Sequence, residues 1–155
     1  MSFQITALDH RPFARFFSMS DAELAENMAT RRIATESPGF PCRVSLADAE
    51  IGDELLLINH THQDGVSPYR ASHAIFVRKG VEQARPAIGE VPDVLGRRML
   101  SLRAFDKAAM IVGGDLVEGR SFAPALDKLL AVSGVSYVHI HYALFGCYAA
   151  RADRS

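Results

Sequence analysis

The segment Met99-Leu-Ser-Leu-Arg-Ala-Phe-Asp-Lys-Ala-Ala-Met-Ile-Val112 is the part of this sequence that best indicates the fold class. Apolar side chains occupy positions 100, 102 and 104, and polar side chains occupy positions 101 and 103, which is the period of a half-buried β-strand. Asp106 and Lys107 can then turn the chain into a second strand over residues 108–112. The segment therefore predicts a β-hairpin.

The chain beyond this hairpin predicts one helix and another pair of strands. Residues 121–132 place apolar side chains on one stripe of a helix, with Ser121 as the N-cap and Gly134 just beyond the end. The stripe consists of Phe122, Leu126, Leu129 and Leu130. Residues 135–142 and 147–151 have strand character, and we expect them to pair with each other.

The first half of the chain is also rich in short strands. Ser20 and Glu23 have the spacing of a capping box, which predicts a helix from there to about residue 29. Strands are predicted at residues 3–8, 42–46, 54–59 and 74–78, and the third should be buried on both faces because its apolar residues do not alternate. A loop is predicted at residues 61–69 and a turn at Gly113-Gly114-Asp115.

Together these segments indicate about seven strands in neighbouring hairpins and two main helices. That grouping is typical of an α+β fold with a largely antiparallel sheet, formed here by residues 1–155 as a single domain. A doubly wound parallel sheet is disfavoured, because each parallel connection needs a crossover that is usually helical.

The composition excludes some classes of partner. The formal net charge of -1 gives no overall field that would attract nucleic acid or an anionic membrane. No stretch approaches the ~20 apolar residues of a membrane span, and the N-terminus does not resemble a secretory signal. We therefore expect a cytoplasmic protein with Cys42 and Cys147 as thiols, and a homodimer is left open.

Two His-x-His doublets are candidate metal ligands. The doublets are His60-Thr-His62 and His139-Ile-His141. Alternate residues of a strand point to the same face, so each doublet can direct two imidazoles at one target. Zinc or another divalent transition metal could be bound by His139, His141 and one further ligand from Cys42, Cys147, His60 or His62. We predict no cofactor, and this metal site remains the alternative.

Arginines in strand-like segments suggest a different site. Arg43, Arg70 and Arg103 would each be costly to desolvate without an anionic partner. They could converge, with Tyr69 and Asp106, on a pocket for a small carboxylate or phosphate ligand. The other reading is structural, with ion pairs from Arg103 to Asp106 or Asp48 and from Arg70 to Glu54 or Asp64.

Catalysis in such a pocket would depend on a nucleophile or a base. Cys147, His139 and Cys42 are the candidates, because a neighbouring cation favours the thiolate form of a cysteine. Neither cysteine belongs to a Cys-x-x-Cys pair. The residues therefore do not decide between an enzyme and a binding protein.

Several segments together resemble a known family. They are Phe40-Pro-Cys-Arg43, residues 48–57, Ser67-Pro-Tyr-Arg-Ala-Ser72 with Ile75-Phe-Val77, Leu100-Ser-Leu-Arg-Ala-Phe-Asp106, and residues 137–139 through Gly146-Cys147. In this order they resemble the bacterial domain-of-unknown-function family 1203 over nearly the whole chain. The resemblance implies no reaction, cofactor or partner.

The family pattern favours some of the candidate residues over others. The resemblance covers Cys42-Arg43, Tyr69-Arg70, Arg103, Asp106, His139 and Gly146-Cys147, but not His60, His62 or His141. It therefore favours the arginine and cysteine set over a metal site common to the family. Three hypotheses follow: a protein that binds or acts on a small anionic metabolite, a metal-binding protein, and an interaction module without catalysis.

Overall fold

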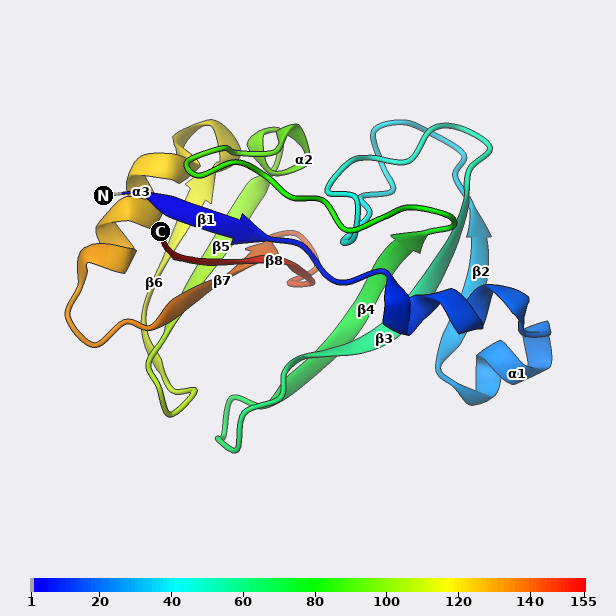
Figure 1. Ribbon diagram of the computed structural model, residues 1–155, viewed down its shortest axis with the longest axis horizontal. Helices are drawn as coiled ribbons and strands as arrows, with labels where there is room; N and C mark the ends of the chain where they lie inside the picture. The colour runs from blue at the N-terminus through cyan, green and yellow to red at the C-terminus, as the bar shows by residue number, and fades with distance from the viewer. Residues whose placement is uncertain (1) are drawn as a thin grey trace.

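Two antiparallel sheets lie side by side along the long axis of the molecule in a computed structural model, which describes residues 2–155 (Figure 1). The larger sheet has the order β1-β8-β7-β5-β6, and the smaller sheet has the order β2-β3-β4. The strands are β1 (Phe3–Thr6), β2 (Ala29–Ile33), β3 (Glu54–Gln63), β4 (Ala71–Arg78), β5 (Met99–Phe105), β6 (Ile111–Glu118), β7 (Tyr137–Tyr142) and β8 (Tyr148–Arg154). This arrangement confirms the predicted α+β class with antiparallel pairing.

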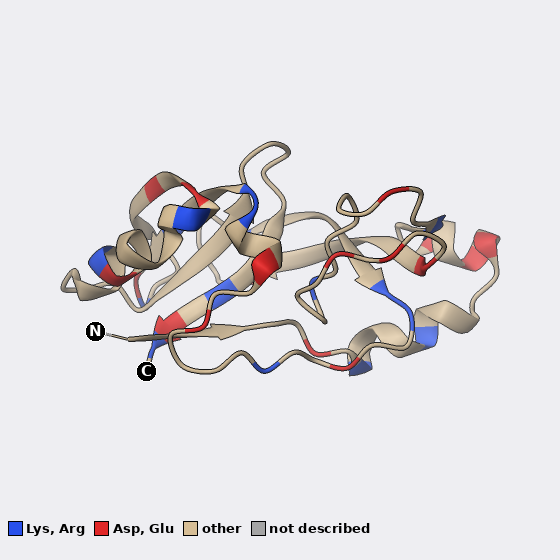
Figure 2. Ribbon diagram, turned by 90° about the horizontal axis from the view of Figure 1, so that it is seen from above, with Lys and Arg blue, Asp and Glu red and all other residues tan. Residues whose placement is uncertain are grey.

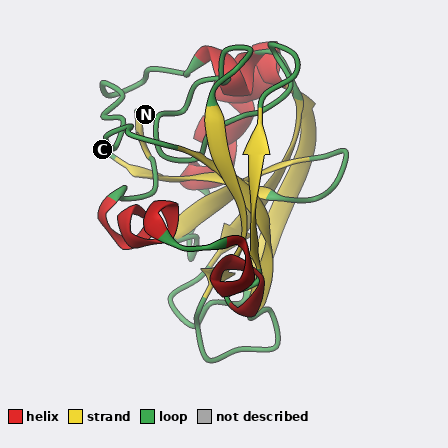
Figure 3. Cartoon of the chain, turned by 90° about the vertical axis from the view of Figure 1, so that its right-hand side faces the viewer, coloured by secondary structure: helices red, strands yellow, loops and turns green. Residues whose placement is uncertain are grey.

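The helices are short and lie at the periphery of the strands (Figure 3). They are the 3-10 helices η1 (Arg11–Ser18) and η2 (Gly119–Ser121) and the α-helices α1 (Asp21–Glu26), α2 (Asp93–Gly96) and α3 (Phe122–Ala131). Within residues 2–155, no helix has both the length and the apolar character needed to cross a membrane.

Helix α3 covers one face of the larger sheet. Its predicted stripe is present, with Phe122, Leu126 and Leu130 buried in the same cluster as the even-numbered residues of β5. Ser121 occupies the predicted N-cap position, but its side chain makes no capping hydrogen bond, because η2 leads directly into the helix. The apolar face of β5 is therefore buried beneath α3, and the opposite face of the sheet remains for polar side chains.

The predicted hairpin of β5 and β6 is confirmed, but one predicted turn is wrong. Gly113-Gly114-Asp115 lies inside β6, opposite residues 102–104 of β5. A Cβ atom at Gly114 would lie 2.7 Å from the carbonyl oxygen of Leu102. The glycine is thus needed for a close approach between strands, which a sequence pattern cannot distinguish from a turn.

The smaller sheet has apolar clusters on both faces, as predicted for β3. Leu56 and Ile58 pack with Phe13 and Phe16 of η1, whereas Leu55 packs on the other side in a second cluster. Strand β3 continues to Gln63, so the loop predicted from residue 61 begins later. The extension carries the histidine doublet of β3 into the sheet.

Two other local predictions need correction. The capping box of α1 is present, but the helix ends at Glu26, and β2 begins at Ala29 after Met28 adopts a positive φ of 53°. Residues 42–46 form a turn instead of a strand, with the amide of Leu46 donating to the carbonyl of Cys42. In both places contacts with distant parts of the chain override the local propensity.

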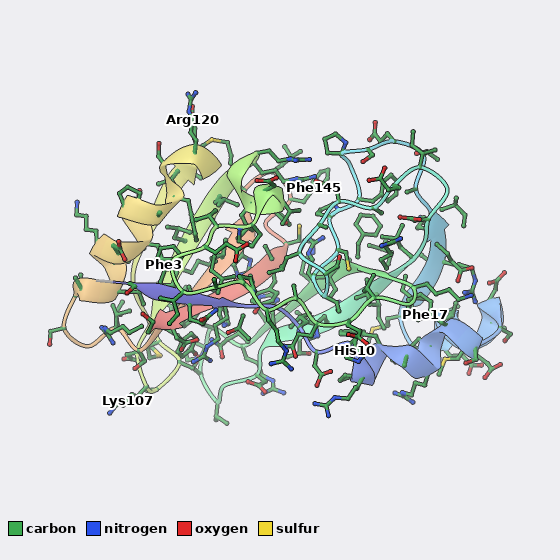
Figure 4. The ribbon with its side chains drawn as sticks, turned by 45° about the horizontal axis from the view of Figure 1, so that its top comes forward. Phe3, His10, Phe17, Lys107, Arg120 and Phe145 are labelled. Atoms are coloured by element: carbon green, nitrogen blue, oxygen red, sulfur yellow. The ribbon has the colours of Figure 1, made fainter. Side chains whose placement is uncertain are left out.

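The two sheets are linked through their hairpins. The Ser67 hydroxyl, in the β3–β4 connection, donates to the carbonyl of Ala109 at 2.8 Å in the β5–β6 turn. Figure 4 labels Lys107 in that same turn. The Gln63 side chain at the end of β3 donates to the Tyr137 hydroxyl at 3.0 Å. The end of β3 is therefore held against the polar face of the larger sheet.

Candidate functional site

The structure brings the two histidine doublets together where the sheets meet. The ring centroids of His62 and His141 are 4.9 Å apart, and that of His139 lies 6.3 Å from each of them. Tyr148 contacts all three rings and is stacked on His62 at 5.6 Å. We call His62, His139 and His141 the histidine cluster. His60 lies beside it, between Phe13 and Tyr148.

Strand alternation explains why these rings share one space. On β7, Val138 and Ile140 are buried in the core beneath α3, so His139 and His141 point to the opposite face. His62 reaches that face from the end of β3. The cluster is therefore formed by two sheets and could not be inferred from either doublet alone.

The histidine cluster is neutral at pH 7. Burial lowers the pKa of His62 to about 4 and the pKa values of His139 and His141 to about 3. The positive charge of Arg103 contributes to the lowering of all three pKa values. Burial also lowers the pKa of His60, although the charge of Asp64 opposes the effect. Each ring of the cluster therefore offers one N–H donor and one lone pair.

The hydrogen bonds of the cluster are incomplete. Nδ1 of His141 lies 2.8 Å from the carbonyl oxygen of Gly146. A carbonyl only accepts, so Nδ1 carries the hydrogen and Nε2 carries the lone pair. Nδ1 of His62 and Nδ1 of His139 are covered and have no partner in residues 2–155. Buried polar atoms without partners are rare in native structures, so these two ring nitrogens call for a specific explanation.

The cluster is not arranged as a metal centre. In the chain from residue 2 to residue 155, no group of three or more His, Cys, Asp or Glu side chains has positions suited to hold a metal ion. Imidazole is the right chemical type of ligand for zinc, but the ring of His62 packs edge against face with both His139 and His141. The geometry of residues 2–155 does not support the metal alternative, which stays a prediction until the metal content is measured.

Arg103 borders the histidine cluster. It lies on β5 directly opposite His139 on β7, so the two side chains share the polar face of the sheet. Loss of hydration lowers its pKa, and no neighbouring charge or hydrogen bond acts against this effect. It is the only partly buried arginine in residues 2–155 with no hydrogen bond or ion pair. The structural reading, in which Arg103 pairs with Asp106 or Asp48, is therefore wrong.

The other partly buried arginines differ in this respect. Arg151, on β8 opposite His139, is bonded through two nitrogens to the carboxylate of Asp153. Arg98 is paired with Asp48. Figure 2 shows acidic and basic residues interspersed along the molecule, in keeping with the net charge of -1. Arg103 thus lacks an acceptor because of its local surroundings, and not because the protein has too few carboxylates.

Arg43 is buried, with 2% of its surface exposed, and its polar contacts are internal. Nε donates to the carbonyl of Tyr148 at 2.7 Å, and a terminal nitrogen donates to the carbonyl of Pro41 at 2.6 Å. The other terminal nitrogen donates to Sγ of Cys147 at 3.0 Å, and the guanidinium lies 4.9 Å from the ring centre of Tyr142. Arg43 therefore ties the residue 42–46 turn to the start of β8.

Arg70, Tyr69 and Asp106 each have a different partner outside the histidine cluster. Arg70 is exposed and donates to the backbone carbonyl of Asp64, so the predicted ion pair with the Asp64 or Glu54 carboxylate is absent from residues 2–155. Tyr69 packs edge-on against Phe105, which contacts His139. The Asp106 carboxylate accepts from two amides of the β5–β6 turn. Of the three arginines, Arg103 is the one beside the histidine cluster.

The two cysteines are both buried thiols. Sγ of Cys42 accepts from the amides of Ser45 and Arg78, which is a structural role in the turn. Sγ of Cys147 accepts from Arg43. Phe145, which is 77% exposed, lies in the same connection between β7 and β8, and Figure 4 labels it between the two sheets.

Sequence reasoning missed two aromatic members of the site. Tyr148 contacts each ring of the cluster, and Tyr137 is stacked on Phe105 at 5.3 Å. Tyr137 lies two residues before His139, so strand alternation would have placed it on the same face. Tyr148 carried no comparable signal, because a β-bulge at His141 shifts its register.

Comparison with known proteins gives one result. The sequence pattern of the family described as Protein of unknown function (DUF1203) matches residues 39–154. The chain belongs to this family. The match to the DUF1203 family includes the histidine cluster, Arg43, Arg103 and both cysteines, whereas β1, η1, α1 and β2 lie before it. No curated protein and no solved structure matches the chain.

Proposed function

We propose that this protein binds a small anionic ligand, a carboxylate or a phosphate, at Arg103 beside the histidine cluster. The observation that carries the proposal is the missing acceptor: Arg103 is partly desolvated, yet it has no hydrogen bond or ion pair within residues 2–155. A guanidinium in that state is stabilised by an anion, which it can bind through two parallel N–H donors.

The neutral state of the cluster suits a ligand of low charge. His62, His139 and His141 add hydrogen-bonding groups next to Arg103 without adding positive charge, because burial holds their pKa values far below 7. Tyr148 packs against all three rings of the cluster, and Phe105 packs against the ring of His139. One arginine with neutral polar neighbours is typical of a site for a small metabolite and not for a polyanion.

Arg43 and Cys147 support this site indirectly. Their contact fixes Cys147 just before β8, and with it the preceding residue, Gly146, whose carbonyl holds the His141 ring. The proposed activity is therefore binding, and no chemical step is assigned to Cys147 or His139. A reaction would need a second group that the arrangement does not identify.

The experiment compares two arginine variants with and without anions. Thermal unfolding is measured in sodium acetate, in sodium phosphate and in sodium chloride of matched ionic strength, because a ligand that binds only the folded state raises the midpoint. We expect dissociation constants on the order of 1 mM for such small probes. Arg103→Met should abolish the effect of acetate and phosphate.

The matched control is Arg78→Met. Arg78 is also partly buried, but it is paired with Asp53 at 2.8 Å in the smaller sheet. This variant should respond to anions as the unchanged protein does. If neither anion raises the midpoint relative to chloride, or if Arg103→Met keeps the full response, the proposed function is wrong.

A further inference from the structure

The tautomer of His141 restricts which ligands fit beside Arg103. The Gly146 carbonyl accepts from Nδ1 of His141 at 2.8 Å, so the hydrogen of this neutral ring is already used. Nε2 therefore carries a lone pair, and it has no partner in residues 2–155. The ring is held in place by perpendicular packing against His62 and Tyr148. His141 can accept a hydrogen bond from a ligand, and it cannot donate one.

Arg103 can only donate hydrogen bonds, and it lies on the same face of the sheet as His141. It is paired across the strands with His139, one alternation along β7 from His141, and the three side chains share one face. Gly146 links the two groups: its carbonyl accepts from His141, and a Cβ atom on it would lie 3.8 Å from a terminal nitrogen of Arg103. The site thus presents a charged donor and a fixed acceptor on the same face of the sheet.

From this pairing we infer that the ligand carries an O–H group next to its anionic oxygens, with Arg103 binding the anion and Nε2 of His141 accepting from the hydroxyl. The inference rests on the proposed function and specifies its ligand class. An anion without an O–H group would leave the lone pair of His141 unpaired after water has been displaced.

Two kinds of metabolite share this chemistry. An α-hydroxycarboxylate has its hydroxyl beside the carboxylate, and inorganic phosphate keeps at least one O–H near pH 7. Acetate and sulfate are their counterparts, since each has anionic oxygens but no O–H. The two members of such a pair differ by one hydrogen bond to the protein. The difference between their binding free energies therefore measures whether the site offers an acceptor.

The test is calorimetric titration of the whole protein with glycolate, acetate, phosphate and sulfate at pH 7. We expect the hydroxyl-bearing member of a pair to bind about tenfold more tightly, which is the value of one well-placed hydrogen bond. A preference for glycolate over acetate identifies the hydroxycarboxylate source, and a preference for phosphate over sulfate alone identifies the phosphate source. Either result supports the inference.

His141→Phe supplies the matched variant. Phenylalanine keeps the ring but removes both nitrogens, so the variant should lose the preference for glycolate over acetate and for phosphate over sulfate. If this variant does not fold, the four titrations of the unchanged protein still decide. Equal binding of both members in each pair overturns this inference and leaves the proposed function standing, whereas no binding of any of the four anions overturns both.

Discussion

Arg43 and Arg103 both approach the segment Gly146–Tyr148, but their surroundings differ. Arg43 is almost fully buried, and each of its three nitrogens has an acceptor: two carbonyls and the sulfur of Cys147. Arg103 is only partly buried and has no acceptor within residues 2–155. Burial of an arginine therefore does not by itself mark a binding site. An unsatisfied guanidinium is the basis of our proposal at Arg103, because its hydrogen-bonding capacity remains available to a ligand.

The largest expected effect tests the structural side of this comparison. Arg43→Met should lower the free energy of unfolding by about 3 kcal/mol, because the carbonyls of Pro41 and Tyr148 lose their donor in a buried environment. Urea denaturation measures the change. Arg78→Met, which breaks a partly exposed pair, should lose about 1 kcal/mol or less. Equal losses in the two variants would mean that Arg43 is not a structural tie.

The histidine cluster should make the protein sensitive to acid. Its folded-state pKa values of about 3 to 4 lie below the usual value of 6.5, so the unfolded chain takes up protons first as the pH falls. The contribution of the cluster to the free energy of unfolding is fully present above pH 6.5, and it declines as the pH falls from there toward 4. Each histidine contributes a slope of about 1.4 kcal/mol per pH unit within this window.

His141→Phe isolates one of these contributions. Its unfolding free energy should depend less steeply on pH between 6 and 4, by about 1.4 kcal/mol per unit. The other charges around the cluster, on Arg103, Arg151 and Asp153, are kept, so the difference in slope reports His141 alone. An unchanged slope would show that this ring is not held neutral in the folded protein.

A smaller effect is expected at Gly146, the glycine that is hydrogen-bonded to His141 and lies close to Arg103. Gly146 has a φ of 77°, where an L side chain is strained, so Gly146→Ala should cost about 1 kcal/mol of stability. Gly134→Ala is the control, since Gly134 also has a positive φ but no heavy atom near its Cβ position. Both should lose similar stability, but only the Gly146 variant should weaken anion binding. Loss of binding in both would contradict a local role for Gly146.

The smallest expected effect concerns metal. Since no set of ligands in residues 2–155 is arranged for an ion, protein purified without a chelating tag should contain less than about a tenth of a zinc per chain. A chelator should leave the unfolding midpoint unchanged. A full equivalent of a transition metal, lost together with stability on chelation, would favour the metal alternative instead.

Much of the fold followed from local patterns. The β5–β6 hairpin, the stripe of α3 and the pair β7–β8 each rest on residues close in sequence, where alternation and capping are informative. Strand β2 was missed, because its residues Ala29–Ile33 follow a helix signal and are paired only with β3. The turn predicted at Gly114 was wrong because the role of this glycine depends on a carbonyl of the facing strand, which the local sequence does not show.

The site was predictable in its parts but not in its assembly. Alternation indicated that His139 and His141 share a face, and desolvation indicated that strand arginines need partners. The meeting of His62 with His141 depends on how the end of β3 lies against β7, which no local pattern encodes. For the same reason, the sequence could not distinguish Arg43, which is satisfied internally, from Arg103, which is not.

The most direct test of the central claim observes both guanidinium groups at once. In ¹⁵N-detected NMR of the arginine Nε–H groups, the signal of Arg103 should shift and saturate as phosphate or glycolate is added, whereas the signal of Arg43 should stay fixed because its Nε already donates to Tyr148. We predict movement at Arg103 and none at Arg43. An Arg103 signal that does not respond to either anion at concentrations well above 1 mM would contradict it.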